Sequence, residues 1–406
     1  MVQIGFGLNC CNMKKLLCLS FLLPYFVFAQ TKLDFNLGHL TQTNFCDTLP
    51  IEFQKNNIFV KVKINGQQKR FMFDTGAITV ISEEIQNLMQ NPEMGMVNLS
   101  DVSNYKKSAS TIQLKQIQLQ SLIFEGIPAV VKDFKKLGFI SCFDFDGIIG
   151  SNLLRHCIVH INIAQKIIIL TDKIENLHLK NAPISTLTLD KQSNPYLKLN
   201  LDTKLQFDAL FDSGASDFIG ISKPVATKAL KKGIGRVLNQ GFGQGAIGLH
   251  GIGQSSQKNR VMFNNLMLGN YKILDFVIEV APNDENAVGL KLCDYGTVTL
   301  DYLNKQFYFE GNQPTQAFKE RTTLGFSFQP EETYYAIGTV WTGTLAEGKG
   351  LKSGFKLLKI NDLDLSTRNT ETDCILFRSA FLSKPSLNIT YQDDKNQVFT
   401  ITLYQE

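Results

Sequence analysis

An internal repeat limits the fold of this chain more than any other sequence feature. An apolar stretch that runs into Asp-Thr-Gly-Ala at Asp74–Ala77 recurs before Asp-Ser-Gly-Ala at Asp212–Ala215. Two further matches follow in the same order, with a spacing that is constant to within one residue: Gly147–Gly150 with Asn286–Gly289, and Ile161–Lys166 with Leu300–Lys305. Such a repeat indicates two copies of one structural unit. We therefore predict two related lobes, over residues 50–175 and 190–310.

Each predicted lobe shows the pattern of short strands joined by tight turns. Apolar residues alternate with lysines from Val60 to Ile64 and stop at Asn65-Gly66, a strong hairpin signal. The same alternation, Leu197–Leu201, precedes the second Asp motif, and helical patterns are confined to Ser82–Met89 and Lys223–Leu230. The chain has 30 Phe and 30 Gly against one Trp, which favours strands and turns. We predict a mainly β fold with two pseudo-symmetric β lobes.

A repeated Asp motif indicates chemistry that a single copy does not. One Asp-Thr-Gly or Asp-Ser-Gly is an ordinary turn sequence, because these residues are common in turns. Two copies in equivalent places, each after an apolar strand, indicate a paired site. A pseudo-two-fold axis between the lobes would bring Asp74 and Asp212 face to face, where two carboxylates about 3 Å apart share one proton. The ionised partner can then take a proton from water while the protonated one polarises a carbonyl group.

The residues that follow each Asp fit such a pair. Gly76 and Gly214 permit the close backbone approach that two facing carboxylates require. Thr75 and Ser213 carry hydroxyls that can lock each loop to the opposite lobe. We therefore expect the two loops to meet between the lobes.

These paired motifs resemble those of the aspartic proteases, in particular the retropepsin-like family. That family has two apolar residues before Asp-Thr/Ser-Gly-Ala and a later apolar-apolar-Gly segment. The resemblance covers both lobes and implies β lobes of acid-protease type, with Asp74 and Asp212 as the catalytic dyad. It also implies that the following residues support the catalytic loops: Thr75, Gly76, Ala77, Ser213, Gly214, Ala215, Ile148, Ile149, Gly150, Ala287, Val288 and Gly289. Ser151–Leu154 is the family's usual helical start, whereas Leu290–Cys293 in the second lobe is less typical.

In that family a β-hairpin flap from each lobe covers a cleft for an extended peptide. The polar stretch Ser100–Ser110 is the candidate flap of the first lobe. Tyr105 is its candidate substrate contact, with an ordinary surface tyrosine as the alternative. Gly243–Gly248 fits the glycine spacing of dinucleotide-binding loops, but no strand leads into it and no acidic residue stands about 20 positions further on. We interpret it as a flexible loop or the tip of the second flap.

A different pattern begins near residue 320. Leu324, Gly325 and Phe326 open it, and Gly350–Gly354 reads Gly-Leu-Lys-Ser-Gly. This pattern resembles a PDZ domain, a small α+β module, over residues 320–406. The resemblance implies that backbone N–H groups at Leu324-Gly325-Phe326 bind a peptide carboxylate while the peptide adds a strand to the sheet edge. The start of an ordinary hairpin is the alternative.

The N-terminal stretch predicts export. Met13–Lys15 reads Met-Lys-Lys and precedes an apolar run, Leu16–Ala29, with a small residue at its end, which is the pattern of a secretory signal peptide. We expect residues 1–29 to be cleaved, with Met13 as an alternative start and an uncleaved anchor as the alternative outcome. No other stretch reaches the roughly 20 consecutive apolar residues of a spanning helix. The mature protein is therefore expected in the periplasm or outside the cell, without a stable membrane span.

Charge and cysteine content argue against several kinds of partner. Lys plus Arg is 41 and Asp plus Glu is 37, a formal charge of +4 with no dense basic tract, so a nucleic-acid partner is not expected. The cysteines that remain after leader cleavage have neither a disulfide-framework spacing nor a zinc spacing. They permit one or two disulfides of undetermined pairing: Cys46, Cys142, Cys157, Cys293 and Cys374. We predict no metal and no cofactor.

We predict an exported aspartic endopeptidase that hydrolyses peptide bonds of extended peptide or protein substrates. The PDZ-like module would recruit substrate by binding a peptide C-terminus, or gate access to the site. The alternative is a catalytically inactive peptide-binding protein of the same fold that acts through the PDZ-like module. An intact Asp in both lobes favours the enzyme. A serine or cysteine hydrolase is a weaker third hypothesis, because the chain has no Gly-x-Ser-x-Gly elbow and its odd number of cysteines lacks a histidine placed for catalysis.

Overall fold

The computed structural model describes residues 33–100, 106–134, 138–243, 247–248, 251–252, 254–282, 285–318, 323–378 and 384–405. The chain divides into two units, Met1–Lys32 and Leu33–Glu406, and all described residues belong to the second. The predicted leader lies outside them. Within these residues, no helix is long and apolar enough to span a membrane. Below, lobe 1 and lobe 2 denote residues 50–175 and 190–310, and the C-terminal region denotes residues 320–406. These boundaries stay predictions.

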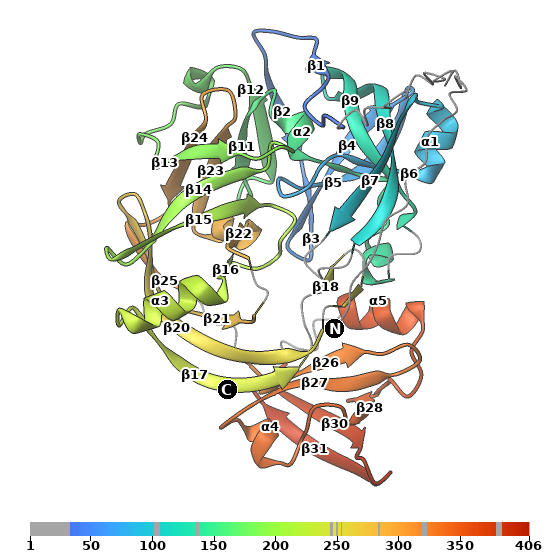
Figure 1. The fold of residues 1–406 in the computed structure, drawn as a ribbon, viewed down its shortest axis with the longest axis vertical. Helices are drawn as coiled ribbons and strands as arrows, with labels where there is room; N and C mark the ends of the chain where they lie inside the picture. Colours follow the sequence, from blue (N-terminus) through green and yellow to red (C-terminus); the bar gives the residue numbers. More distant parts are fainter. Residues whose placement is uncertain are drawn as a thin grey trace, which may run out of the picture. The chain divides into compact units, whose positions relative to one another are not determined.

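The chain is mainly β, which confirms the predicted fold class (Figure 1). The first sheet is formed by β1 (His39–Leu40), β3 (Glu52–Gln54), β4 (Asn57–Ile64), β5 (Gln67–Phe73), β6 (Val80–Ser82), β7 (Glu93–Ser100), β8 (Lys106–Leu119), β9 (Leu122–Lys132) and β10 (Gly147–Ile149). The short helices after β9 and β10 are the 3₁₀ helix η2 (Gly138–Phe143) and α2 (Ser151–Leu154).

The predicted hairpin of lobe 1 is confirmed. Strands β4 and β5 pair antiparallel, and Asn65 and Gly66 between them have φ angles of 50° and 76°. Positive φ at both positions is what a two-residue hairpin turn requires. Lys61 and Lys63 are exposed while their apolar neighbours are buried, so β4 covers the core with one face. Both predicted helices are also present, as α1 (Glu83–Met89) and α3 (Lys223–Lys231).

Lobe 2 repeats the strand pairing of lobe 1. Its strands up to Gly289 are β14 (Pro195–Leu201), β15 (Leu205–Asp212), β16 (Ile219–Gly220), β17 (Gly235–Gly243), β18 (Ile247–Gly248), β19 (Gly251–Ile252), β20 (Ser256–Leu268), β21 (Tyr271–Val280) and β22 (Ala287–Gly289). The short strand β25 (Thr315–Ala317) lies beyond residue 310 and pairs parallel with β21. In lobe 1, β10 pairs parallel with β5 and antiparallel with β6. In lobe 2, β22 pairs parallel with β15 and antiparallel with β16. Each Asp motif therefore lies beside the Gly of its matched apolar segment.

Strands from both lobes join in one antiparallel sheet. The order is β2 (Cys46–Pro50), β12 (Ile167–Thr171), β11 (Ile158–Asn162), β23 (Gly296–Asp301), β24 (Gln306–Gly311) and β13 (Ser185–Leu189). The junction is β11 with β23, where Val159 lies opposite Leu300. The 3₁₀ helices η3 (Ile174–Leu177) and η4 (Leu290–Asp294) follow β12 and β22.

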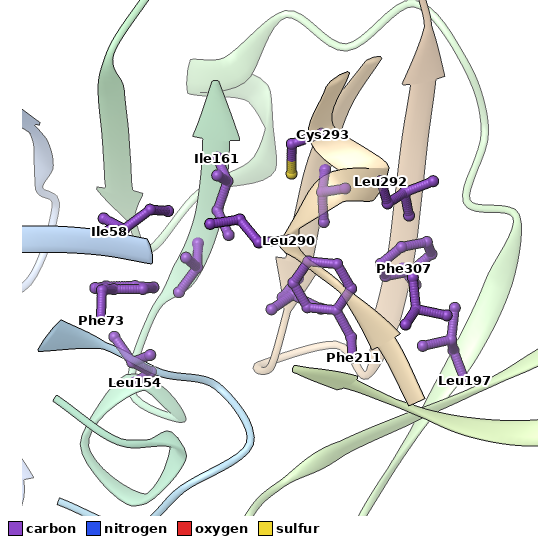
Figure 2. Packing of buried hydrophobic residues seen from close by; sticks show 14 of the residues in the cluster. Ile58, Phe73, Leu154, Ile161, Leu197, Phe211, Leu290, Leu292, Cys293 and Phe307 are labelled. Atoms are coloured by element: carbon purple, nitrogen blue, oxygen red, sulfur yellow. The ribbon is translucent and has the colours of Figure 1, made fainter. Parts of the chain in front are cut away.

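One hydrophobic core runs through both lobes (Figure 2). It contains the fully buried Phe73 and Phe211, which directly precede the two Asp residues. The ring of Phe211 packs on that of Phe307, with centroids 5.8 Å apart. Burial of an apolar side chain of this size stabilises the fold by about 2–3 kcal/mol. Each Asp motif is thus anchored by the core at the residue before it.

The C-terminal region has a core of its own. Its elements are β26 (Phe326–Pro330), β27 (Tyr335–Trp341), α4 (Leu345–Gly348), β28 (Lys356–Ile360), β29 (Leu363–Asp364), α5 (Thr370–Arg378), β30 (Ser386–Gln392) and β31 (Val398–Tyr404). A separate cluster around the fully buried Tyr335 and Ile389 fills it. These elements make an α+β region, and the PDZ assignment itself stays a prediction.

Candidate active site

The two Asp motifs end equivalent strands. Asp74 follows β5, and its backbone N–H donates to the carbonyl of Ile149 in β10 at 3.0 Å. Asp212 is the last residue of β15 and pairs with Gly289 in β22. Both side chains are only partly buried, so a water molecule can reach them. The parallel strand next to each Asp therefore fixes the position of the Asp backbone, and with it the carboxyl group, at the end of the sheet.

The structure brings Asp74 and Asp212 together. A Cβ atom built on Gly76 would lie 2.5 Å from the Asp212 Cγ atom, and one built on Gly214 would overlap the carboxyl group of Asp74. Each carboxyl thus packs on the glycine of the opposite motif, where any side chain would push it away. Asp74 Oδ1 accepts from Gly76 N–H at 2.8 Å, and Asp212 Oδ1 accepts from Gly214 N–H at 2.8 Å and Ala215 N–H at 3.1 Å.

The hydroxyls of Thr75 and Ser213 cross between the two loops. Thr75 Oγ1 donates to the carbonyl of Phe211 at 2.7 Å and accepts from Ser213 N–H at 3.0 Å. Ser213 Oγ donates to the carbonyl of Phe73 at 2.9 Å and accepts from Thr75 N–H at 3.0 Å. Both side chains are fully buried, so the loss of one hydroxyl would leave unpaired polar groups. These four hydrogen bonds fix the two carboxyls relative to each other.

The apolar-apolar-Gly segments contact the catalytic loops from behind. Gly150 and Gly289 lie so close to the loop backbones that an added Cβ atom would overlap Ile78 in lobe 1 and Asp217 in lobe 2. The N–H of Ser151 donates to the carbonyl of Ala77 at 2.8 Å, and the N–H of Leu290 to that of Ala215 at 2.9 Å. The predicted support residues of these segments therefore lie against the loops: Ile148, Ile149, Gly150, Ala287, Val288 and Gly289.

The electrostatics of the pair favour a single shared proton. Burial raises the pKa of Asp74 well above its ordinary value, and the negative charge of Asp212 raises this pKa further. Burial also raises the pKa of Asp212, but the hydrogen bonds that it accepts from Asp74, Gly214 and Ala215 oppose that rise. Two adjacent carboxyls cannot both ionise at low cost. The pair therefore shares one proton, and the hydrogen bonds that oppose the rise at Asp212 favour Asp74 as the carboxyl that holds it.

One asymmetric contact escaped the sequence analysis. The hydroxyl of Ser151 donates to the carbonyl of Thr75 at 2.5 Å and lies 3.1 Å from the hydroxyl of Tyr302, a buried residue just after β23. Because the Ser151 proton is used on Thr75, Tyr302 is the donor of the second bond. At the spacing of the repeat, Leu290 and Ile163 take the places of Ser151 and Tyr302. A comparison of the two copies of the repeat could have revealed this hydrogen bond, because two polar residues stand where the other copy has two apolar ones.

A second support was missed in lobe 1. The Oδ1 atom of Asn152 accepts from the N–H and from the hydroxyl of Thr79, both at 2.8 Å, and its amide donates to the carbonyl of Pro128 at 2.8 Å. Asn152 and Thr79 are fully buried. They tie α2 to the strand after the catalytic loop, and nothing in the sequence pattern distinguishes this Asn from a turn residue.

The described cysteines comprise one disulfide, two buried thiols and the exposed thiol of Cys46. Cys142 in η2 is bonded to Cys374 in α5, a pairing that the sequence left open. Burial raises the pKa of the Cys157 and Cys293 thiols far above the usual value, which disfavours a thiolate nucleophile at either position. In the described part of the chain, no cluster of His, Cys, Asp and Glu could hold a metal ion.

The predicted flaps fall on two hairpins. Ser100–Ser110 spans the end of β7 and the start of β8, and Tyr105 lies outside the described residues. Gly243–Gly248 begins at the last residue of β17 and ends in β18, within the β17–β20 hairpin, so a strand does lead into it, contrary to the expectation from the sequence. Residues 244–246 are likewise outside the described residues. Their proposed contacts with a substrate stay predictions.

The residues predicted to bind a carboxylate form a bend before β26. Leu324 is buried, and Gly325 has a φ of 77°. A Cβ atom on Gly325 would lie 2.6 Å from Thr344 Oγ1, so both the backbone and the space require glycine here. The N–H of Gly325 donates to Thr323 Oγ1 at 3.1 Å, and Phe326 pairs with Val340. The binding role of this bend stays a prediction.

One family match supports an aspartic protease site in lobe 1. Residues 60–153 match the model of a family described as aspartyl protease. Among solved structures, the chain is similar to a retropepsin-like aspartic protease from Rickettsia conorii, with 17% identity, 33% of this chain and 93% of that chain covered, and a TM-score of 0.23. No curated protein matched the chain. The family match includes Asp74 and the segment that supports its loop, and it supports an aspartic protease.

Proposed function

We propose that this chain is an exported aspartic endopeptidase that cleaves extended peptide or protein substrates. The observation that carries the proposal is the facing pair of Asp74 and Asp212, in which each carboxyl packs on the glycine of the opposite motif and each loop is held by a hydroxyl of the other. The raised pKa of Asp74 supports a shared proton. The family match over residues 60–153 supports it. Export rests on the N-terminal sequence pattern.

The pair can perform both proton transfers of peptide hydrolysis. Ionised Asp212 takes a proton from a bound water, and the oxygen of that water attacks the carbonyl carbon of the scissile bond. Protonated Asp74 donates a hydrogen bond and then its proton to the carbonyl oxygen, which would otherwise carry the developing charge. When the tetrahedral intermediate collapses, the leaving nitrogen takes the proton held by Asp212, and the carboxyl product returns a proton to Asp74. The pair ends as it began.

The C-terminal region is proposed to act on substrate access. The bend at Gly325 precedes β26, whose strand pairing in the described residues is with β27, so its other edge can accept an added peptide strand. This property supports recruitment of a peptide C-terminus, and gating remains the competing role.

The test is cleavage of a peptide library by the mature protein, with and without a transition-state-mimic inhibitor of aspartic proteases. We expect Asp212→Asn to lower turnover by about three orders of magnitude or more, because no ionised partner remains to take the proton of water. Asp208→Asn is the matched control, since Asp208 lies in the same strand but is exposed and paired with Lys198. Its activity should remain within about two-fold.

A binding protein without activity is the alternative. If wild-type protein cleaves no peptide but binds immobilised peptides with free C-termini, the alternative replaces the proposal. Full activity of Asp212→Asn would contradict the two-Asp mechanism and would instead indicate that lobe 1 works in pairs.

A further inference from the structure

The C-terminal region is joined to lobe 2 by strand pairing. The end of β27 pairs antiparallel with the end of β17, with Trp341 opposite Gly241 and Val340 opposite Phe242 (Figure 1). Thr342 extends this contact: its N–H donates to the carbonyl of Gln240 at 2.8 Å, and its hydroxyl accepts from Gln240 N–H at 3.0 Å. The β17–β20 hairpin, a candidate flap, is thus continued by a strand of the C-terminal region.

The glycines of β17 are required by this contact. A Cβ atom on Gly241 would lie 2.7 Å from Thr339 Cγ2 and 2.9 Å from the Trp341 ring, and one on Gly243 would lie 2.6 Å from the backbone of Thr339. Both glycines are buried. This Gly-rich stretch is predicted from the sequence to be a loop or flap tip. In the structure, Gly241 and Gly243 lie in β17 and allow β27 to approach closely.

The same region is joined covalently to lobe 1. The Cys142–Cys374 disulfide connects η2 of lobe 1 with α5, and both elements are firmly held. The guanidinium group of Arg70 donates to the carbonyls of Phe143 at 2.6 Å and Asp144 at 3.0 Å, which fixes the end of η2. Arg368 binds the buried Asp373 through two nitrogens, at 2.9 and 2.8 Å, which fixes the start of α5.

These two attachments close a ring. The path runs from Asp74 through lobe 1, the disulfide, the C-terminal region, the β27–β17 pair and lobe 2 to Asp212, which contacts the Asp74 side. We infer that the C-terminal region is a third wall of the substrate site and limits it to unfolded, extended chain segments. A segment that lies across the dyad beneath the β17–β20 hairpin passes through this ring. A surface loop of a folded protein remains attached to its domain at both ends, and the domain does not fit through the ring. The inferred substrate class rests on the proposed peptidase function. The disulfide and the β17–β27 pairing are independent of that function.

The attachments can be tested without activity. Trp341 is the only tryptophan of the chain and is buried in the β17–β27 junction, so its fluorescence reports on that contact. We expect Gly243→Ala to shift the emission to the red, because the added methyl group forces β27 away from β17. Gly348→Ala is the matched control, since a Cβ atom there meets nothing within 4 Å. Non-reducing peptide mapping should find Cys142 bonded to Cys374. Unchanged Trp341 emission in Gly243→Ala, or two free thiols at these positions, would overturn the ring.

The substrate class is tested by opening the covalent link. The double variant Cys142→Ser/Cys374→Ser is compared with wild type and with Cys46→Ser, which removes an exposed free thiol. Each is given a short peptide, an unfolded protein that contains the same cleavage sequence, and that protein folded with the sequence in a surface loop. We expect the unfolded-to-folded rate ratio to fall about ten-fold or more in the double variant while peptide cleavage stays within about three-fold.

The outcomes separate the two proposals. If the ratio is equal in all three proteins, the third wall is refuted while the peptidase stands. If no protein cleaves the peptide, the proposed function fails, and the fluorescence and peptide mapping alone decide on the ring.

Discussion

At the scale of single residues, the site is pseudo-symmetric in its catalytic loops and asymmetric behind them. Thr75 and Ser213 make equivalent hydrogen bonds across the pair. Behind the Asp74 loop, however, Tyr302 and Ser151 add a hydrogen-bond chain from lobe 2 that the Asp212 loop does not share, because Leu290 occupies the equivalent position. This chain ends on the carbonyl of Thr75 and so positions the loop that carries the protonated carboxyl.

Tyr302→Phe tests this positioning role. Loss of one buried hydrogen bond of about 1 kcal/mol should lower kcat about five-fold and leave KM unchanged, because this chain supports the loop that carries Asp74 and none of the residues proposed to bind the substrate chain. Tyr308→Phe is the control, since its hydroxyl donates to Gln306 Oε1 within its own strand β24. A change in KM alone, or an equal loss in both variants, would contradict the role.

The pH dependence of activity follows from the dyad. Burial and the charge of Asp212 raise the pKa of Asp74, and Ala77 and Ala215 offer no hydroxyl that would stabilise the charged form. We therefore expect kcat to persist into mildly acidic or near-neutral pH and, as the pH rises further, to fall when Asp74 loses its proton. A rate profile of the mature protein with short peptides checks this. Activity confined to strongly acidic pH would contradict it.

At the scale of elements, the β17–β27 pair changes the expected role of the C-terminal region. Its sequence pattern and separate core suggest an independent module whose removal leaves short-peptide cleavage unchanged. The strand pairing predicts otherwise, because without β27 the end of β17 loses a neighbour at the hairpin proposed to cover the dyad.

Deletion of residues 320–406 decides between these expectations. We expect kcat/KM for short blocked peptides to fall about ten-fold or more, since a misplaced flap costs orientation of the substrate. Circular dichroism must show that the lobes still fold, which their own continuous core favours. Full peptide cleavage by the folded, truncated chain would show that β27 does not position the hairpin.

At the scale of the whole molecule, the shared proton links stability to pH. The pKa of Asp74 is raised in the folded chain, so the folded chain holds a proton that the unfolded chain releases. The stability gained from this proton is complete below the ordinary carboxyl pKa and is lost as the pH rises through the raised pKa of Asp74.

Urea unfolding from acidic to neutral pH measures this linkage. The free energy of unfolding of wild type should decrease with pH over that window, and Asp74→Asn, which cannot titrate there, should show a smaller decrease. Asp208→Asn should follow wild type, because its carboxyl is exposed. Parallel curves for wild type and Asp74→Asn would mean that the pair holds no extra proton in the folded state.

Local pattern and repetition are enough to predict part of this fold and its paired Asp residues. Alternation from Val60 to Ile64 and the Asn65-Gly66 turn predict a hairpin, and the repeat of the Asp motif predicts that Asp74 and Asp212 pair. Burial of one face of a strand and the turn preference of Asn-Gly act within a few residues, so the pattern itself carries them.

Contacts between residues that are far apart in the sequence are visible only in the tertiary structure. Cys142 and Cys374 are far apart in sequence, and no local preference selects that pair among the five cysteines. The hydrogen bond from Tyr302 to Ser151 and the approach of β27 to Gly241 likewise join segments whose patterns are independent of each other. Such contacts depend on how completed elements pack in three dimensions, because a polar side chain or a glycine has the same local signature whether it finds a distant partner or faces water.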